Sequence, residues 1–334
     1  MYNLTREHPK LIEDHVVTIL IFTNWVFGCG IISLFGVITN AINIVIFLRL
    51  GLKDTVNISL LGLAIADLCG LVFLILISIF YNPLFYELDL PFNAPEVEYL
   101  AFGWPRLIFT RTTSWITALV TFERCLCVTF PLKVKTLITP RRVGCAVLAI
   151  YFIMACSITP TYYSNLLGWK FDVERNKTVF GLIYRKERRA VDGVSFIVGV
   201  LITSVSYIFV VACSLVLVFS LKRQTKKFST MVGQSSESTG AVNKDVVDSR
   251  TAKSRQVTKM ILVLSIVFIV CYIPSNLVQL GMALVKDFNK GGRYANTHVV
   301  AWTIVHVMEA SNSSRDRSYK KVNGLQIPLS ETRL

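Results

Sequence analysis

Long apolar runs separated by short polar segments dominate the hydrophobic pattern of this chain. A helix needs about 20 apolar residues to cross the hydrocarbon core of a bilayer. Six runs of that size are followed by a shorter seventh, and the expected spans are 25–48, 57–80, 100–128, 143–164, 194–221, 257–285 and 296–314. No strand-like alternation competes with these runs. The pattern predicts an all-α membrane protein, a seven-transmembrane helix bundle with an incomplete seventh helix.

Composition agrees with this class. The chain has 334 residues, of which 53% are hydrophobic and only 17% are charged. These values do not suit a water-soluble globule of this length, so a polytopic protein in a lipid bilayer is the expected class.

The distribution of basic residues between the polar segments predicts the orientation. One set of segments holds fifteen Lys/Arg against four Asp/Glu and the other holds twelve of each; the first set is 49–56, 130–142 and 222–259, and the second is 1–24, 81–99, 165–193 and 286–295. Lys and Arg gather on the cytoplasmic side. We therefore expect residues 1–24 outside, 222–256 as a cytoplasmic third loop and 315–334 as a cytoplasmic tail. The net charge of +14 is then a topological signal and indicates no nucleic-acid partner.

Two sequons and eight cysteines bear on covalent chemistry outside the membrane. With an outside N-terminus, Asn3 and Asn176 stand in usable glycosylation sequons. All eight cysteines fall within the expected spans or at their cytoplasmic ends. A structural disulfide needs paired cysteines in an oxidising compartment, so none is expected.

Charged and small residues inside the spans are the first candidates for function, because charge in a membrane is costly unless it is paired or hydrated. Glu123 and Arg124 end the third span, and Glu123 can hold Arg124. The other interpretation is that Arg124 snorkels to the lipid headgroups. Asp67, buried in the second span, predicts a polar cavity with water or a cation. Gly36 and Asn40 share a helical face, which suits close helix contact and one interhelical hydrogen bond.

Four motifs in order carry a resemblance to a known family; they are Gly36–Asn40, Leu63–Asp67, Glu123-Arg124-Cys125 and Phe268–Pro274. Together they resemble the rhodopsin-like (class A) family of G-protein-coupled receptors, over about residues 25–314, and the nearest type is an invertebrate peptide or chemosensory receptor. The resemblance implies a multi-pass plasma-membrane receptor, not an enzyme, that binds an extracellular peptide or small molecule and acts on a heterotrimeric G protein. Tyr99 stands near the place of the family's usual cysteine, in line with the absence of a bridge.

The resemblance also implies roles for residues of this chain. Glu123 and Arg124 would form the G-protein coupling switch. Phe268, Tyr272 and Pro274 would form the activation joint. A sodium ion, the one cofactor expected, would be held by the oxygen atoms of Asp67, Thr113, Asn312 and Ser313, and a hard cation suits that oxygen set.

The candidate ligand-binding residues are Arg106, Tyr272, His306 and Glu309. Arg106 lies five turns above Arg124 on the inward face of the third span, where a cation favours an anionic ligand over an amine. Arg106 pairing with Glu96 or Glu98 is the other interpretation. His306 and Glu309 are spaced i, i+3, as ligand contacts or as a hydrogen-bonded pair. Arg111 lies off the inward face and is expected to contact a neighbouring helix or water.

The end of the seventh span departs most from the family. Asn312-Ser313 fits the family pattern, but five charges follow within seven residues, from Arg315 to Lys321. We expect the helix to stop near Ser314 and the ending to leave this form with little signalling. A second hypothesis, from another class, is a small secondary transporter with Asp67 and Glu309 as ion carriers; the lack of a repeat counts against it.

Overall fold

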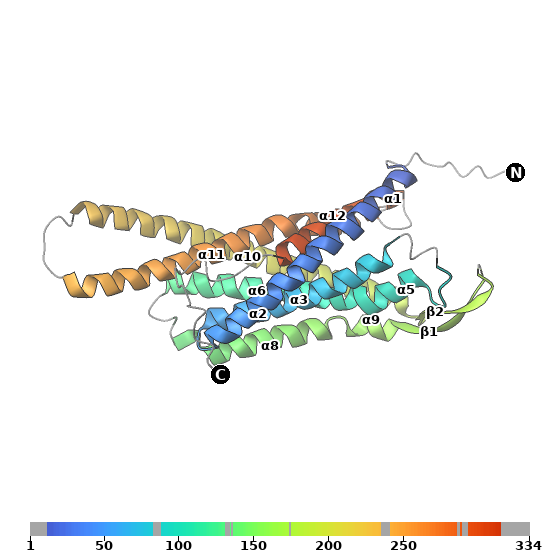
Figure 1. Ribbon diagram of the computed structural model, residues 1–334, viewed down its shortest axis with the longest axis horizontal. Helices are drawn as coiled ribbons and strands as arrows, with labels where there is room; N and C mark the ends of the chain where they lie inside the picture. Colours follow the sequence, from blue (N-terminus) through green and yellow to red (C-terminus); the bar gives the residue numbers. More distant parts are fainter. Residues whose placement is uncertain are drawn as a thin grey trace, which may run out of the picture.

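Seven helical spans lie side by side in an elongated bundle in the computed structural model (Figure 1). The structure describes residues 12–82, 88–130, 134, 136–173, 175–234, 241–285, 288 and 293–314. The expected glycosylation site Asn3 and the expected tail 315–334 lie outside the described residues.

The first span consists of helix α1 (Asp14–Phe22), a π-helical stretch η1 (Thr23–Ile31) and α2 (Ile32–Leu50), and the second is α3 (Thr55–Phe80). A short helix α5 (Ala94–Glu98) and a π-helical turn η2 (Tyr99–Gly103) lead into α6 (Trp104–Thr129). The remaining helices are α8 (Pro140–Cys156), α9 (Thr159–Ser164), α10 (Arg188–Gln234), α11 (Ala241–Leu284) and α12 (Ala295–Ser313). All seven expected spans are therefore mainly helical, and the fourth has a turn at residues 157–158 between α8 and α9.

Local sequence explains several of these boundaries. The Asp54 carboxylate caps α3 by accepting the Val56 backbone N–H, and Thr139 caps α8, which has Pro140 at its first position. Within the part of the chain that the structure describes, five helical segments are long and apolar enough to cross a membrane; they are His15–Leu50, Thr55–Phe80, Pro140–Ser164, Ala190–Arg223 and Gln256–Met282. Helices α6 and α12 are the polar exceptions, and they carry most of the candidate site.

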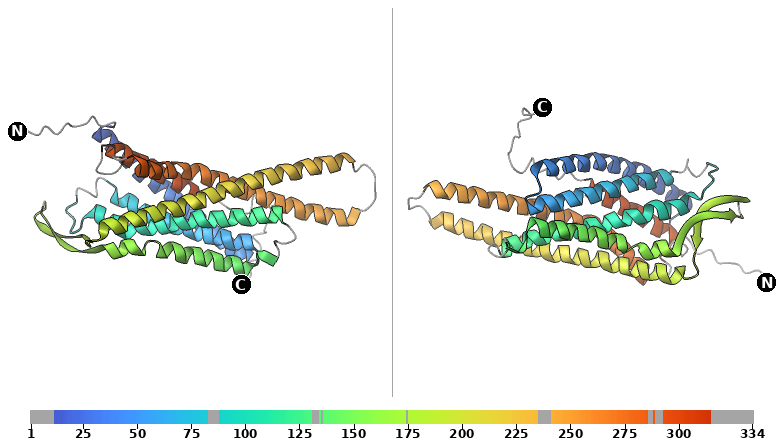
Figure 2. Two further views of the ribbon diagram at one scale, coloured as in Figure 1. Left: turned by 180° about the vertical axis from the view of Figure 1, so that it is seen from behind. Right: turned by 90° about the horizontal axis from the view of Figure 1, so that it is seen from below.

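Two expected boundaries were wrong. The first helix begins at Asp14 and not near residue 25, because the apolar residues Val16–Phe22 continue the span toward the N-terminus. The third loop, expected over 222–256, is helical up to Gln234 and again from Ala241. Its abundant Lys, Arg and Gln favour helix, so α10 and α11 extend well beyond the rest of the bundle (Figure 2).

A β-hairpin was missed by the sequence analysis. Strands β1 (Asn165–Asp172) and β2 (Lys177–Tyr184) pair antiparallel, with Trp169 opposite Phe180. The hairpin projects from the end of the bundle opposite the long extensions of α10 and α11 (Figures 1 and 2). We call the end with the hairpin the hairpin end. The opposite end, where α6 stops, is the Arg124 end.

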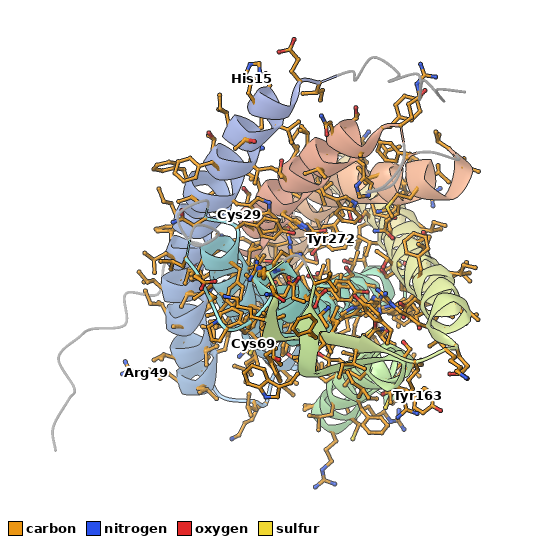
Figure 3. All side chains as sticks on the ribbon, turned by 90° about the vertical axis from the view of Figure 1, so that its right-hand side faces the viewer. His15, Cys29, Arg49, Cys69, Tyr163 and Tyr272 are labelled. Atoms are coloured by element: carbon orange, nitrogen blue, oxygen red, sulfur yellow. The ribbon has the colours of Figure 1, made fainter. Side chains whose placement is uncertain are left out.

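The interior of the bundle is built from apolar clusters that join several helices. One cluster near the Arg124 end includes Phe47, Leu60, Ile116 and Ile261, and another joins Trp25, Cys29 and residues of α3 to Ala310 of α12. Tyr272 lies in the interior, whereas Arg49 and Tyr163 lie at the periphery (Figure 3). Apolar side chains also cover much of the exterior, as the bilayer requires.

Helix α12 ends against the middle of α2. Asn40 Nδ2 donates to the Ser313 carbonyl at 2.6 Å, and Thr39 Oγ1 donates to the Ser314 carbonyl at 3.1 Å. A Cβ on Gly36 would lie 2.9 Å from the Ser314 Cα, so only glycine allows this approach. The close contact and interhelical hydrogen bond expected at Gly36 and Asn40 are confirmed. Since Asn40 is ten residues before Leu50, α12 stops about 15 Å short of the end of α2.

Candidate functional site

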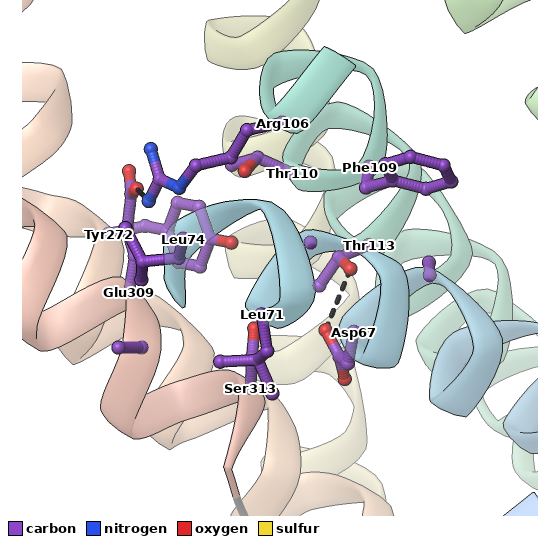
Figure 4. Close-up of a pocket in the computed structure, with 13 residues that line it drawn as sticks. Asp67, Leu71, Leu74, Arg106, Phe109, Thr110, Thr113, Tyr272, Glu309 and Ser313 are labelled. Carbon is purple, nitrogen blue, oxygen red and sulfur yellow. Dashed lines mark hydrogen bonds and ion pairs between the residues drawn. The ribbon is translucent and has the colours of Figure 1, made fainter. Parts of the chain in front are cut away.

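A small polar cavity lies at the centre of the bundle, between α3, α6, α11 and α12 (Figure 4). Its volume is about 20 Å³, which is room for about one water molecule or a small ion. Asp67, Arg106, Thr113, Tyr272 and Glu309 supply the polar part of its lining. The sequence analysis named all five, and the structure brings them together.

Arg106 and Glu309 close the cavity toward the hairpin end with an ion pair between α6 and α12. Arg106 Nη2 lies 2.6 Å from Glu309 Oε2, and both residues are almost buried, at 5% and 6% exposure. The other interpretation paired Arg106 with Glu96 or Glu98, but in the structure the partner of Arg106 is Glu309, and Glu96 pairs with Lys170. A buried charge pair is costly to break from one side, since the remaining charge is left without its partner.

His306 adds a second partner to Glu309. Its Nδ1 lies 3.5 Å from the same Glu309 oxygen that Arg106 contacts, so the expected pairing of these two residues is found. The imidazole ring also stacks on Trp302 and lies 5.0 Å from the Trp25 ring of η1. Trp25 in turn stacks on Tyr81 at 4.5 Å. The sequence analysis missed this aromatic support, because no pattern within the first span relates Trp25 to the seventh.

Asp67 lies deeper in the cavity and accepts a hydrogen bond from Thr113 Oγ1 at 2.8 Å (Figure 4). Ser313 also lines this cavity, whereas Asn312 lines a neighbouring one. Thr113 donates its hydroxyl hydrogen to Asp67. The lone pairs of the Thr113 oxygen then suit a cation. Three of the four expected sodium ligands therefore gather around one space, and their hydroxyl and carboxylate oxygens fit a hard cation.

Below the cavity, α6 and α11 meet through aromatic and hydroxyl groups. Tyr272 and Phe268 of α11 stack at 4.4 Å and are both buried, and Pro274 lies two residues after Tyr272 in the same helix. The hydroxyls of Thr121 and Ser265 join the two helices at 2.8 Å. The sequence analysis missed this pair, since serine and threonine are common in membrane helices and carry no distinctive spacing.

Glu123 and Arg124 lie at the other end of α6. Arg124 Nη2 is 4.0 Å from Glu123 Oε2, which is at the outer limit of an ion pair. Glu123 Oε1 instead accepts a shorter hydrogen bond, 2.8 Å, from Ser59 of α3. Glu123 Oε2 and Arg124 Nε have no hydrogen-bond partner although both atoms are buried. The structure thus brings the expected pair together but holds it loosely.

A single carboxylate fastens the hairpin to the start of α6. Glu96 of α5 contacts Lys170 of β1 at 2.7 Å through one oxygen and accepts the Leu182 N–H of β2 at 2.7 Å through the other. The backbone of Phe180 also bonds to Pro91 and Asn93. A Cβ on Gly181 would collide with the Glu96 carboxylate, so this glycine makes room for it. We call Glu96, Lys170 and the Leu182 N–H the Glu96 clamp.

Two further features concern the expected covalent chemistry. All eight cysteines are free thiols in the structure, and the lack of disulfides stays a prediction. Asn176 is exposed in the turn between β1 and β2, with a positive φ of 47°, where its side chain is accessible. Beside it, the hydrogen bond from Lys177 holds the pKa of the Asp89 carboxyl below its ordinary value.

Comparison with known proteins gives a consistent result. Residues 39–316 match the family model described as 7 transmembrane receptor (rhodopsin family). The chain is 25% identical over 274 residues to galanin receptor 2a of Danio rerio, covering 80% of this chain. It is also 25% identical over 305 residues to the galanin-like G-protein coupled receptor npr-9 of Caenorhabditis elegans, covering 82% of this chain. The aligned chain spans 65% of the length of each relative.

Proposed function

Because this chain belongs to the rhodopsin family of seven-transmembrane receptors, we propose that it is a G-protein-coupled receptor for an extracellular peptide. It is a multi-pass membrane protein. In the proposed orientation the hairpin end faces outside at the plasma membrane, and the Arg124 end meets a heterotrimeric G protein. The excess of basic residues in the segments around the Arg124 end supports this orientation.

The observation that carries the proposal is the buried Arg106–Glu309 pair above a polar cavity. Arg106 presents a fork of N–H donors that suits a carboxylate, and in the structure Glu309 occupies it. A peptide with a free acidic group competes with Glu309 for Arg106. The names of both relatives include galanin, and the likeness of this chain to galanin-type receptors supports the peptide class.

The proposed mechanism is a shift between two arrangements of the bundle. A ligand shifts this equilibrium only by its difference in affinity for the two states. Ligand binding to Arg106 frees Glu309 and loosens α12 from α6. Tyr272 and Phe268, which pack beneath, then move with α11 about Pro274. The Thr121–Ser265 hydrogen bond breaks, and Arg124 leaves Glu123 for the G protein.

Asp67, Thr113 and Ser313 supply oxygen ligands for a sodium ion in this proposal, with Asn312 joining only after a local shift. A bound cation would neutralise the Asp67 carboxylate between the two ion pairs of α6. Glycosylation at Asn176, and at Asn3, belongs to the same proposed orientation. Since the matched family and both relatives are receptors, none of these findings supports the transporter hypothesis.

Ligand-driven nucleotide exchange on a purified heterotrimeric G protein tests the function. Peptides that differ only in a free or an amidated terminal carboxylate should differ in potency, because only the free acid competes with Glu309. Arg106→Gln should remove that difference while Arg106→Lys keeps part of it. Uptake of a substrate without any nucleotide exchange would contradict the receptor proposal.

A further inference from the structure

Arg111 of α6 is a buried cation that neither the cavity nor the switch uses. It is 8% exposed, and it lies on the face of α6 that also carries Trp115 and Phe122, away from Arg106. Arg111 lies thirteen residues from Arg124, or about 20 Å along the helix. In a hydrocarbon core about 30 Å thick, this position is well inside the bilayer.

The surroundings of Arg111 fix the guanidinium without neutralising it. Arg111 Nη1 donates a hydrogen bond to Ser157 Oγ at 3.1 Å, and the Ser157 hydroxyl in turn donates a hydrogen bond to the Met154 carbonyl. Among the described residues, no carboxylate lies within ion-pair distance of Arg111. Arginine keeps its charge in proteins and carries five N–H donors, so the site retains a positive charge and unused donors.

The neighbouring helix makes room for this cation. A Cβ on Gly199 of α10 would collide with Arg111 Nη2, so the guanidinium fills a notch that only glycine leaves open. Ser157 lies between the end of α8 and the start of α9, and α9 packs against α10. We call the boundary between these elements, where the Arg111 guanidinium lies between Ser157 and Gly199, the α8–α10 seam. Exposed apolar residues flank it on both sides, namely Phe152 and Ile153 of α8 and Val198 and Leu201 of α10.

We propose that Arg111 and Ser157, with the guanidinium seated against Gly199, form a second binding site, which takes the head group of an amphiphilic anion from the bilayer. The ligand class is a carboxylate or phosphate that carries an acyl chain. The head group completes the hydrogen bonds of Arg111, and the chain packs along the apolar exterior of α8 and α10. A charge inside a membrane is costly unless paired, and an anion supplied by the lipid phase meets that need. The site is separate from Arg106 and does not rest on the proposed receptor function.

Photolabelling of the full-length chain in neutral detergent tests the site. The probes are oleate with a diazirine in its acyl chain, the methyl ester of the same compound, and a phosphatidic acid bearing the same chain, with labelled residues mapped by mass spectrometry. Oleate should label the α8–α10 seam at least about tenfold more than the ester, because a charge-assisted hydrogen bond is lost in the ester. Stronger labelling by phosphatidic acid points to phospholipid as the source, and stronger labelling by oleate to free fatty acid. Either result supports the anion site.

Variants make the test specific to Arg111. Arg111→Gln should lower seam labelling by oleate about tenfold, and Arg111→Lys should retain most of it. Arg124→Gln, which removes a different α6 cation, is the matched control and should not change it. Equal labelling by oleate and its ester in the unchanged chain would overturn the proposal and indicate that water alone solvates Arg111. This comparison holds even if Arg111→Gln folds poorly, because it needs no variant.

Discussion

At the hairpin end of α6, Arg106 pairs with Glu309 of α12 at 2.6 Å, whereas at the opposite end Arg124 pairs with its own neighbour Glu123 at 4.0 Å. Separating the first pair requires one helix to move against another. Separating the second requires only a side-chain rotation, since Ser59 continues to hold Glu123. The same helix is thus held firmly across the bundle at one end and only loosely at the other. The proposed mechanism, with a ligand at one end and a partner at the other, needs this difference.

The largest expected effect comes from breaking the tight pair. Glu309→Ala leaves the buried Arg106 unpaired and should lower the free energy of unfolding by about 3–5 kcal/mol, measured by thermal unfolding in detergent. Ser311→Ala on the same helix, where the exposed hydroxyl bonds only to its own helix, is the control. Replacing both partners, as Arg106→Met with Glu309→Leu, should recover most of the loss. If Glu309→Ala and Ser311→Ala unfold alike, the pair is not the firm tie described above.

The Glu96 clamp should have the next largest effect. Glu96→Gln removes a charge-assisted contact to Lys170 and weakens the bond to the Leu182 N–H, a loss of about 1.5–3 kcal/mol in local stability. Faster hydrogen exchange at Leu182 would measure it, with Glu187→Gln on the exposed chain after β2 as the control. Reducing agent should change nothing, because all the cysteines are free. Protection lost on reduction would contradict this view of the hairpin.

The loose pair should matter little for stability and much for signalling. Glu123→Gln keeps an acceptor for Ser59, so it should cost only about 1 kcal/mol, yet it should raise basal nucleotide exchange because Arg124 is no longer attracted to it. Arg124→Ala should abolish exchange. Unchanged basal exchange in the first variant and a normal ligand response in the second would remove the switch from this end of α6.

The smallest effect concerns the cavity between the two pairs. If Asp67 and Thr113 hold sodium, salt exchange from potassium to sodium should stabilise the folded chain by about 0.4 kcal/mol when the sodium concentration equals the dissociation constant. Asp67→Asn should remove this difference, and Thr113→Ser, which keeps the hydroxyl, should preserve it. A sodium effect that persists in Asp67→Asn would place the ion elsewhere.

Much of this architecture could be predicted from the sequence, because each span carries its own signal. The length of an apolar run sets a helix, and the spacing of Gly36 and Asn40 marks a contact face. What periodicity cannot give is the partner of that face. For Arg106 the sequence analysis weighed a ligand contact against a partner nearby in the chain, but its partner Glu309 is 203 residues away. The clamp, in turn, joins Glu96 to a hairpin whose short strands carry little alternation. Thr121 and Ser265 were missed for the same reason.

The junction of α12 with α2 has a consequence for the order in which the molecule is assembled. The amide of Asn40 and the hydroxyl of Thr39 bond to carbonyls some 273 and 275 residues later, in addition to the Gly36 carbonyl of their own helix. Their contact with α12 therefore forms only after almost the whole chain is synthesised. Helices α3 to α11 can insert and pack with their neighbours as they emerge, but the bundle closes only when its first and last spans meet. Until that last step the carbonyls of Ser313 and Ser314, at the end of α12, lack these two donors. Substitutions at Gly36 or Asn40 should therefore act on maturation before they act on any ligand.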